Sequence, residues 1–199
     1  MNLDFYRPIK LNNIDVIKTK MLEIVQKHVS FNEPLFRYIE SDEFINIPEF
    51  KKQLQAYELY EYISYCVISI STQGTSAIHI DTGGFTYSLN IPILGFDNTF
   101  LNFYSSAKAP EIKLTPKGVE YLGYDVEDCE LAYKVESKEP VLINTQIPHS
   151  FQNCNTDPRL VILCRINRDW DIRKWSYLKL ASREGVEPPP SVLETDVLP

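Results

Sequence analysis

The sequence predicts a mainly β protein, a jelly roll with supporting helices at its N-terminal end. The first observation behind this prediction is a series of eight short β-type runs between about residues 62 and 167. The second is that glycines and an Asp-Asn pair separate several of these runs, as expected for turns between antiparallel strands. The third is that helical periodicity comes before the strands. Eight strands linked by turns are typical of a jelly roll.

Two helices are expected before the strands. Apolar residues recur at helical spacing from residue 14 to about residue 29, and Asn13 is a suitable N-cap for this segment. His28 lies near the end of this helix, where a partial positive charge is favourable. Residues 30–48 are expected to be irregular because prolines interrupt them, and residues 49–60 to form a short amphipathic helix.

The β core is expected to belong to one domain. We expect its strands at residues 66–71, 76–80, 86–93, 99–104, 111–114, 131–135, 141–143 and 159–166. Residues 118–128 are expected to form a long acidic loop. The domain spans residues 1–182, with a helical part (1–61) and a β core (about 62–167). Residues 183–199 hold four prolines and four acidic residues, which predicts a disordered tail.

Composition is consistent with one water-soluble domain. Hydrophobic residues make up 44% of the 199 residues, enough for a substantial core. No run approaches the ~20 apolar residues of a membrane span, and the first ten residues contain no apolar signal region. The formal net charge of −7 disfavours a nucleic-acid partner, which normally requires a basic surface.

The four cysteines form no CxxC pair, which argues against a structural zinc site. Cys66 and Cys164 lie in apolar strands, and we expect them to be buried free thiols. Because free thiols persist in a reducing compartment, the expected localisation is cytoplasmic.

Two of the three histidines lie in short segments that together predict a metal site. His79-Ile80-Asp81 forms an H-x-D motif, and His149 follows 70 residues later. Because side chains alternate along a strand, His79 and Asp81 share one face while Ile80 points away. Two imidazoles and one carboxylate are the facial triad that binds Fe(II) and leaves coordination positions open.

A buried arginine is the second chemical signal. Arg159 lies ten residues beyond His149 and begins the apolar strand RLVILCRI, in which Arg165 shares its face. A charge inside an apolar strand is costly unless it is paired, and a guanidinium binds a carboxylate in a bidentate manner. A bound dicarboxylic acid would supply the missing partner.

The order of H-x-D, a distal histidine and an arginine one strand later resembles the Fe(II)/2-oxoglutarate-dependent dioxygenases. The resemblance covers roughly residues 62–167, and residues 141–166 are most similar to the aspartyl/asparaginyl and prolyl hydroxylase branches. It implies a double-stranded β-helix, a cupin-like jelly roll. It also implies that His79, Asp81 and His149 are the metal ligands and that Arg159 pairs with the distal carboxylate of 2-oxoglutarate.

The resemblance also implies further cosubstrate-binding residues. Members of this superfamily often use a Tyr or an Asn on the strand that follows H-x-D. Tyr87 and Asn90 are the candidates here, and they lie on opposite faces of that strand. Asn102 and Tyr104 raise the same question one strand later. Arg165 is expected to pair with an acidic residue or to contact the 1-carboxylate or the substrate.

The implied function is hydroxylation of a C–H bond in an amino-acid or protein side chain. Fe(II) is the implied cofactor, and 2-oxoglutarate and O2 are the cosubstrates, with release of succinate and CO2. Two alternatives remain open: a metal-binding cupin-like enzyme that does not use 2-oxoglutarate, and a non-catalytic jelly-roll binding module. Arg159 distinguishes the 2-oxoglutarate-dependent dioxygenase from the cupin-like enzyme, because an enzyme that does not use 2-oxoglutarate has no need of this arginine.

Overall fold

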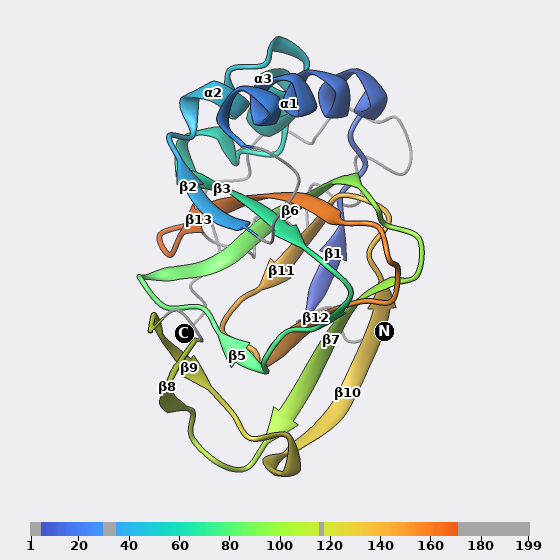
Figure 1. Ribbon diagram of the computed structural model, residues 1–199. Helices are drawn as coiled ribbons and strands as arrows, with labels where there is room; N and C mark the ends of the chain where they lie inside the picture. The colour runs from blue at the N-terminus through green and yellow to red at the C-terminus, as the bar shows by residue number, and fades with distance from the viewer. Residues whose placement is uncertain (1–4, 30–34, 116–117, 171–199) are drawn as a thin grey trace, which may run out of the picture.

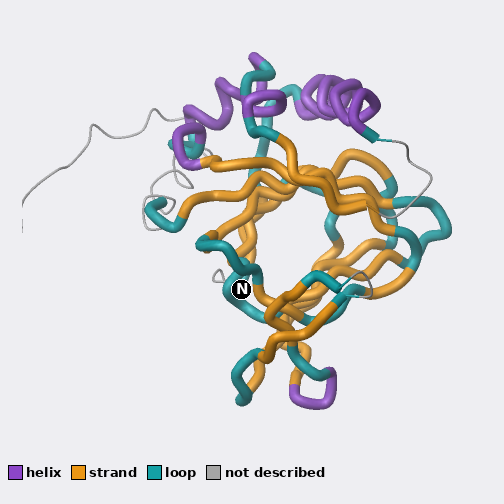
Figure 2. The backbone as a smooth tube through the Cα atoms, turned by 60° about the vertical axis from the view of Figure 1, so that its left-hand side comes forward, coloured by secondary structure: helices purple, strands orange, loops and turns teal. Residues whose placement is uncertain are grey.

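Two antiparallel sheets face each other and enclose a barrel (Figure 2). A computed structural model of the protein describes residues 5–29, 35–115 and 118–170. The arrangement is a jelly roll with helices from the N-terminal part of the chain on one side (Figure 1). This confirms the fold class expected from the spacing of the strands.

The first sheet has six strands in the order β1-β11-β6-β13-β3-β2. In that order they are β1 (Tyr6–Pro8), β11 (Val141–Asn144), β6 (Phe85–Leu94), β13 (Arg159–Asn167), β3 (Ile63–Ser71) and β2 (Leu35–Ile39). β13 lies in the middle and pairs with both β6 and β3. The strand that carries both predicted arginines is therefore a central strand of this sheet.

The second sheet is less regular and runs β10-β7-β12-β5-β9-β8, with β4 paired to β12. Its strands are β10 (Cys129–Glu136), β7 (Thr99–Ser106), β12 (His149–Asn153), β5 (His79–Ile80), β9 (Glu120–Gly123), β8 (Glu111–Leu114) and β4 (Gly74–Thr75). Both predicted histidine ligands lie on adjacent strands of this sheet.

Three helices cover the outer face of the first sheet (Figure 1). They are α1 (Ile14–His28), α2 (Asp42–Ile45) and α3 (Pro48–Ala56), followed by the 3-10 turn η1 (Tyr60–Tyr62). α1 buries Ile17, Met21 and Val25, which are spaced four residues apart and so form one stripe. This stripe belongs to the same apolar cluster as Ile162 and Cys164 of β13. The residues that alternate with these along β13, Arg159 among them, therefore face the barrel interior.

Several elements differ from the expectations. The segment expected to be irregular, residues 30–48, contains β2 and α2. The expected loop 118–128 contains β9 and a 3-10 turn, η2 (Val126–Asp128). The expected strand 76–80 reduces to the two-residue β5, and β12 was not expected at all. The strands among these elements are short, and pairing with a neighbour rather than local sequence preference decides their conformation.

Helix α1 begins where its N-cap was expected, although by a different mechanism. Asn13 adopts the left-handed conformation, with φ of 55°, and its side chain caps no backbone N–H. The histidine expected at the helix end, His28, forms a hydrogen bond with Glu43 of α2 between Nε2 and Oε2, 2.7 Å apart. It lies in the helical layer and does not contribute to the predicted metal site.

The buried thiols are confirmed. Cys66 and Cys164 face each other across β3 and β13, with their Sγ atoms 3.6 Å apart, and neither is exposed. Their mutual hydrogen bond and burial raise the pKa of Cys66 well above its usual value. Residues 183–199, expected to form a tail, lie outside the described residues. No helix in the described ranges is long and apolar enough to cross a membrane.

Candidate metal centre

The fold brings the three predicted metal ligands together. His149 on β12 lies directly opposite His79 on β5, so both imidazoles project from the same face of the second sheet. Their ring centroids are 4.5 Å apart. Asp81 follows β5 by one residue, and one ligand atom from each of the three side chains lies within 4.8 Å of the others. This separation suits side chains that share one metal ion.

Backbone carbonyls orient both imidazoles. Nδ1 of His79 lies 2.9 Å from the carbonyl oxygen of Ala77, and Nδ1 of His149 lies 2.9 Å from that of Ile147. A carbonyl only accepts, so each Nδ1 carries the proton and each Nε2 keeps its lone pair. Such a hydrogen bond on the far nitrogen fixes the tautomer of a metal-binding histidine. Both histidines are therefore prepared to bind a metal through Nε2.

The two oxygens of Asp81 have different surroundings. Oδ1 lies 3.7 Å from Nε2 of His79, whereas Oδ2 accepts a hydrogen bond from the Arg165 guanidinium. Burial raises the pKa of Asp81, but Arg165 and the two imidazoles outweigh it, so the pKa lies below its usual value. The carboxylate is therefore charged at neutral pH, and Oδ1 is the oxygen directed at the metal position.

His149 is the more deeply buried histidine, with 6% of its surface exposed. Burial and the neighbouring His79 lower its pKa to about 4, although Asp81 acts in the opposite direction. A neutral imidazole has a free lone pair at physiological pH. His149 and Asp81 are therefore in the protonation states that binding of a divalent cation requires.

A residue that sequence reasoning missed holds the Asp81 loop in place. Nε2 of Gln146 donates to the carbonyl oxygens of Asp81, at 3.1 Å, and Phe85, at 2.8 Å. Thr145 accepts from the backbone N–H of Asp81 and donates from Oγ1 to Phe85. Gln146 lies three residues before His149, so this contact joins the two halves of the site. Its only signal in the sequence is its polarity next to the distal histidine.

Arg159 lies at the other end of β13 in an aromatic environment. Only 3% of it is exposed, and its guanidinium carbon lies 5.3 Å from the Phe96 ring and 5.1 Å from the Phe151 ring. Burial lowers its pKa to about 10, so it remains charged at neutral pH. No carboxylate of the described ranges pairs with it. A buried cation of this kind favours binding of an anion.

A second unsatisfied polar group lies beside Arg159. Ser71 of β3 is directly opposite Arg159, and its buried Oγ has no hydrogen-bond partner among the described residues. Phe151 is two residues after His149 and so shares its face, about 7 Å along the strand. The Arg159 guanidinium, which lies against Phe151, is therefore two positions along β12 from the metal-ligand candidate His149. An anion bound by Arg159 and Ser71 could belong to a short dicarboxylate whose other end reaches the metal.

The other predicted cosubstrate residues lie in different places. Asn90 is buried on the interior face of β6, opposite Leu163, and accepts a hydrogen bond from Ser88. Tyr87 lies on the outer face, where it packs on the helical core and contacts Trp170. Of these two side chains, the structure directs only Asn90 into the barrel.

Asn102 and Tyr104 also lie outside the barrel. Phe103 is directly opposite His149 and shares its interior face, so the residues on either side of Phe103 point to the outer face of the second sheet. There both side chains are within hydrogen-bond distance of the Ser150 hydroxyl. Neither side chain is directed at the metal centre.

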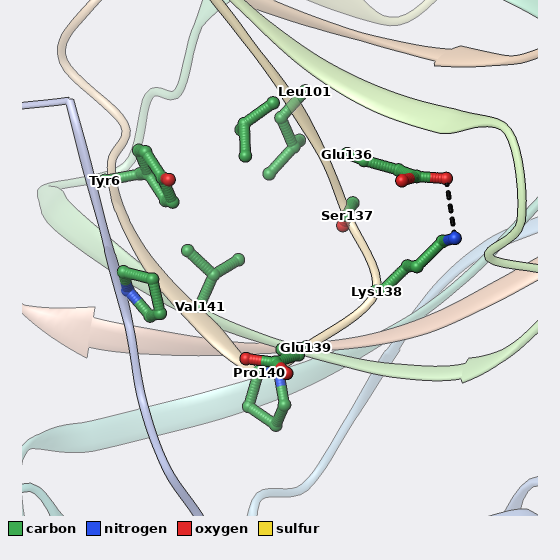
Figure 3. A pocket seen from close by; sticks show the side chains of 10 residues that line it. Tyr6, Leu101, Glu136, Ser137, Lys138, Glu139, Pro140 and Val141 are labelled. Atoms are coloured by element: carbon green, nitrogen blue, oxygen red, sulfur yellow. Dashed lines mark ion pairs between the residues drawn. The ribbon is translucent and has the colours of Figure 1, made fainter.

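The pocket drawn in Figure 3 is separate from this centre. It has a volume of about 240 Å³ and lies among β1, β7, β10 and β11. Its lining includes Tyr6, Leu101 and the ion pair between Glu136 and Lys138. None of the three metal-ligand candidates lines it, and we do not assign it to the site.

Comparisons with known proteins identify the fold. No protein-family model and no curated protein matches the sequence. Among solved structures, the non-heme alpha-ketoglutarate-dependent epimerase SnoN from nogalamycin biosynthesis matches with a TM-score of 0.50 at 11% identity, over 97% of this chain and 92% of that chain. The carbocyclase SnoK from the same pathway matches with a TM-score of 0.50 at 11% identity, over 83% of this chain and 81% of that chain. A prolyl-4-hydroxylase from Pseudomonas putida matches with a TM-score of 0.47 at 11% identity, over 84% and 94% respectively.

These likenesses are structural, since the identities are too low to transfer an activity. The chain has the jelly-roll fold of non-heme enzymes that use 2-oxoglutarate, with a candidate His-Asp-His metal site in its barrel. Its side chains fit both groups: two imidazoles and a carboxylate for Fe(II), and a buried guanidinium with no carboxylate partner among the described residues for a dicarboxylate.

Proposed function

We propose that the protein is an Fe(II)/2-oxoglutarate-dependent oxygenase that hydroxylates a C–H bond of an amino-acid or protein side chain. The observation that carries the proposal is the position of Arg159. It is a buried cation without a carboxylate partner in the described ranges, stacked on Phe151, two residues from His149. A metal site alone is common to many folds, but a metal site beside an unpaired buried guanidinium supports a dicarboxylate cosubstrate.

Each residue then has a defined task. His79, Asp81 and His149 hold the metal, while Arg165 holds the second oxygen of Asp81. Arg159, with the Ser71 hydroxyl beside it, binds the distal carboxylate of 2-oxoglutarate. When bound, iron and 2-oxoglutarate supply the oxidising chemistry, in which O2 and 2-oxoglutarate yield succinate, CO2 and the oxidised substrate.

The assignment of the substrate to amino-acid or protein side chains rests on two further observations. The segment from residue 141 to residue 166 resembles the aspartyl/asparaginyl and prolyl hydroxylase branches. The net charge of −7 disfavours nucleic acid, because a phosphate backbone binds to basic surfaces. SnoN and SnoK are an epimerase and a carbocyclase, so the reaction product must be identified as well as the turnover of 2-oxoglutarate.

Calorimetry with the Mn(II) form tests the proposal. We expect 2-oxoglutarate to bind the Mn(II)-loaded protein, and N-oxalylglycine to compete with it. Iron- and oxygen-dependent formation of succinate should follow in the Fe(II) form even without substrate. If 2-oxoglutarate does not bind the Mn(II) form, the cupin-like enzyme becomes the better account. If no metal binds either, the protein is a non-catalytic jelly-roll module. A substrate product that gains one oxygen atom identifies hydroxylation.

A further inference from the structure

Four aromatic side chains form a ledge that leads away from the metal centre. The ledge consists of Phe36, Tyr38, Tyr65 and Phe85. Neighbouring rings meet at steep angles, with centroids 5.6 Å apart for the first pair, 5.3 Å for the second and 4.8 Å for the third. Edge-to-face contacts of this kind are favourable and hold the rings in order. The ledge is therefore a continuous row that joins strand β2, strand β3 and the start of β6.

The inner end of the ledge lies beside the metal centre. Tyr65 is directly opposite Arg165, the residue that binds Asp81. Phe85 ends the loop that begins at Asp81, and Gln146 binds the carbonyl oxygens at both ends of this loop. A molecule that rests on Tyr65 and Phe85 is therefore next to the metal ligands.

The outer end of the ledge is exposed. Phe36 is 52% exposed and Tyr38 is 64% exposed. They pair with Ser69 and Val67, so they lie on the interior face of the first sheet, at its rim. β2 is an edge strand, and no other strand of the described ranges pairs with its outer side (Figure 1). Arg37 lies between the two rings in sequence and donates to the carbonyl oxygen of His28, so the two exposed rings remain together at this rim, which indicates a binding surface.

We propose that the aromatic ledge is the docking surface for an extended polypeptide substrate, one side chain of which enters the metal centre. This inference rests on the proposed function and narrows its substrate from amino-acid or protein side chains to polypeptides. The length of the ledge supports a polypeptide substrate, because a free amino acid can cover only one of the three distances between neighbouring rings. The open edge of β2 adds main-chain hydrogen-bonding groups that an extended segment can use.

Charge favours a polypeptide over single-stranded nucleic acid, which also stacks on aromatic rows. Binding of a phosphate backbone requires a basic groove, whereas this chain carries a net charge of −7. Arg168 lies on the loop side of the ledge, where its Nε donates to the carbonyl oxygen of Gly84. A single cation at this position suits an acidic side chain of a peptide better than a chain of phosphates.

The test compares two edge strands that carry exposed apolar pairs. The ledge variant is Phe36→Thr with Tyr38→Thr, which keeps β propensity and removes the rings. The control variant is Ile112→Thr with Leu114→Thr on β8, whose side chains are 70% and 64% exposed. Register places this control pair on the face opposite to His79. Tyr38→Arg alone provides a second ledge variant, and near-ultraviolet circular dichroism checks the fold of each.

The probe is a phage-displayed library of random peptides, selected on the wild-type protein loaded with Mn(II) and N-oxalylglycine. We expect enriched peptides whose fluorescent copies bind the ledge variants at least about tenfold more weakly than the wild type, as for loss of a central aromatic contact. They should bind the control variant as tightly as the wild type. Calorimetry should show unchanged 2-oxoglutarate binding to every variant.

Several outcomes overturn the inference. The first is that no peptide is enriched. The second is that enriched peptides bind the ledge variants as tightly as they bind the wild type. The third is that a single-stranded oligonucleotide, rather than a peptide, binds in a way that depends on the ledge. Failure of the proposed function has a different signature, because 2-oxoglutarate would then not bind the wild-type Mn(II) form. If peptide binding depends on the ledge but 2-oxoglutarate does not bind, the docking surface is supported and the proposed enzymatic function is contradicted.

Discussion

The two ends of strand β13 carry the same residue type in opposite electrostatic situations. Arg159 and Arg165 are both less than 10% exposed, and both face the barrel interior. Arg165 donates to the carboxylate of Asp81, whereas the Arg159 guanidinium carbon lies 5.3 Å from the Phe96 ring and 5.1 Å from the Phe151 ring and pairs with no carboxylate of the described residues. The difference shows how a buried charge can be interpreted: a carboxylate of the protein pairs with Arg165, whereas no carboxylate of the described residues pairs with Arg159.

The same difference predicts opposite effects on stability. Removing one partner of a buried ion pair leaves a buried charge unsatisfied, whereas replacing an unpaired charge by an apolar side chain does not. The Arg165 end therefore stabilises the fold and the metal ligand, while the Arg159 end keeps a binding position at a cost in stability. Four sets of variants test this contrast.

The largest expected effect is loss of the metal. We expect the wild type to bind about one Mn(II) per chain, and we expect each of three variants to abolish this binding: His79→Ala, Asp81→Ala and His149→Ala. Each variant removes one of only three protein ligands of the facial triad. Electron paramagnetic resonance of free Mn(II) measures the bound fraction. His28→Ala is the matched control, since this histidine pairs with Glu43 in the helical layer and should leave binding unchanged. Wild-type affinity in all three site variants would exclude the triad.

The second effect concerns the partner of Asp81. Arg165→Met should weaken Mn(II) binding by about 10–100-fold, since residues that orient a metal ligand typically contribute that much. It should also lower the free energy of unfolding of the metal-free protein by about 3 kcal/mol, because it leaves the carboxylate buried and unpaired. Arg37→Met on β2, an exposed arginine that donates to the carbonyl oxygen of His28, serves as the control in the Mn(II) titration. Unaltered Mn(II) affinity would mean that the Arg165 contact does not position the ligand.

The third effect isolates the other arginine. Arg159→Met should raise the dissociation constant of 2-oxoglutarate at least about tenfold, equivalent to about 1.5–3 kcal/mol for a charged hydrogen bond. Mn(II) affinity should stay near the wild-type value, and the metal-free protein should be as stable as the wild type or more so. Calorimetry and denaturant unfolding provide the two measurements. If Arg165→Met weakens 2-oxoglutarate binding more than Arg159→Met does, the assignment of the two arginines must be reversed.

The smallest effect compares the two faces of β6. Asn90→Ala should weaken 2-oxoglutarate binding by about fivefold, the loss of roughly one neutral hydrogen bond, because Asn90 faces the interior between the two arginines. Tyr87→Phe should leave this binding unchanged, since the tyrosine packs on the helical core. The same calorimetric titration measures both. A larger loss for Tyr87→Phe would show that the outer face of β6 takes part in cosubstrate binding.

The sequence by itself determined the fold class and the three metal-ligand candidates. Both follow from local rules: alternation in strands separates Ile80 from His79 and Asp81, and turn residues separate one strand from the next. It also identified the two arginines as a pair on one face. It did not identify β2 or β12, because these strands exist through pairing with distant neighbours rather than through local preference.

Only the tertiary structure decided which polar residues meet. Gln146 binds the carbonyl oxygens of Asp81 and Phe85, and Ser71 lies unsatisfied beside Arg159, although neither stands out in the sequence. Alternation permits two faces for every strand, and only packing of the first sheet on the helices shows that Asn90 faces the interior while Tyr87 does not. Which arginine is paired depends on a carboxylate 84 positions away, and such a contact is a property of the assembled barrel.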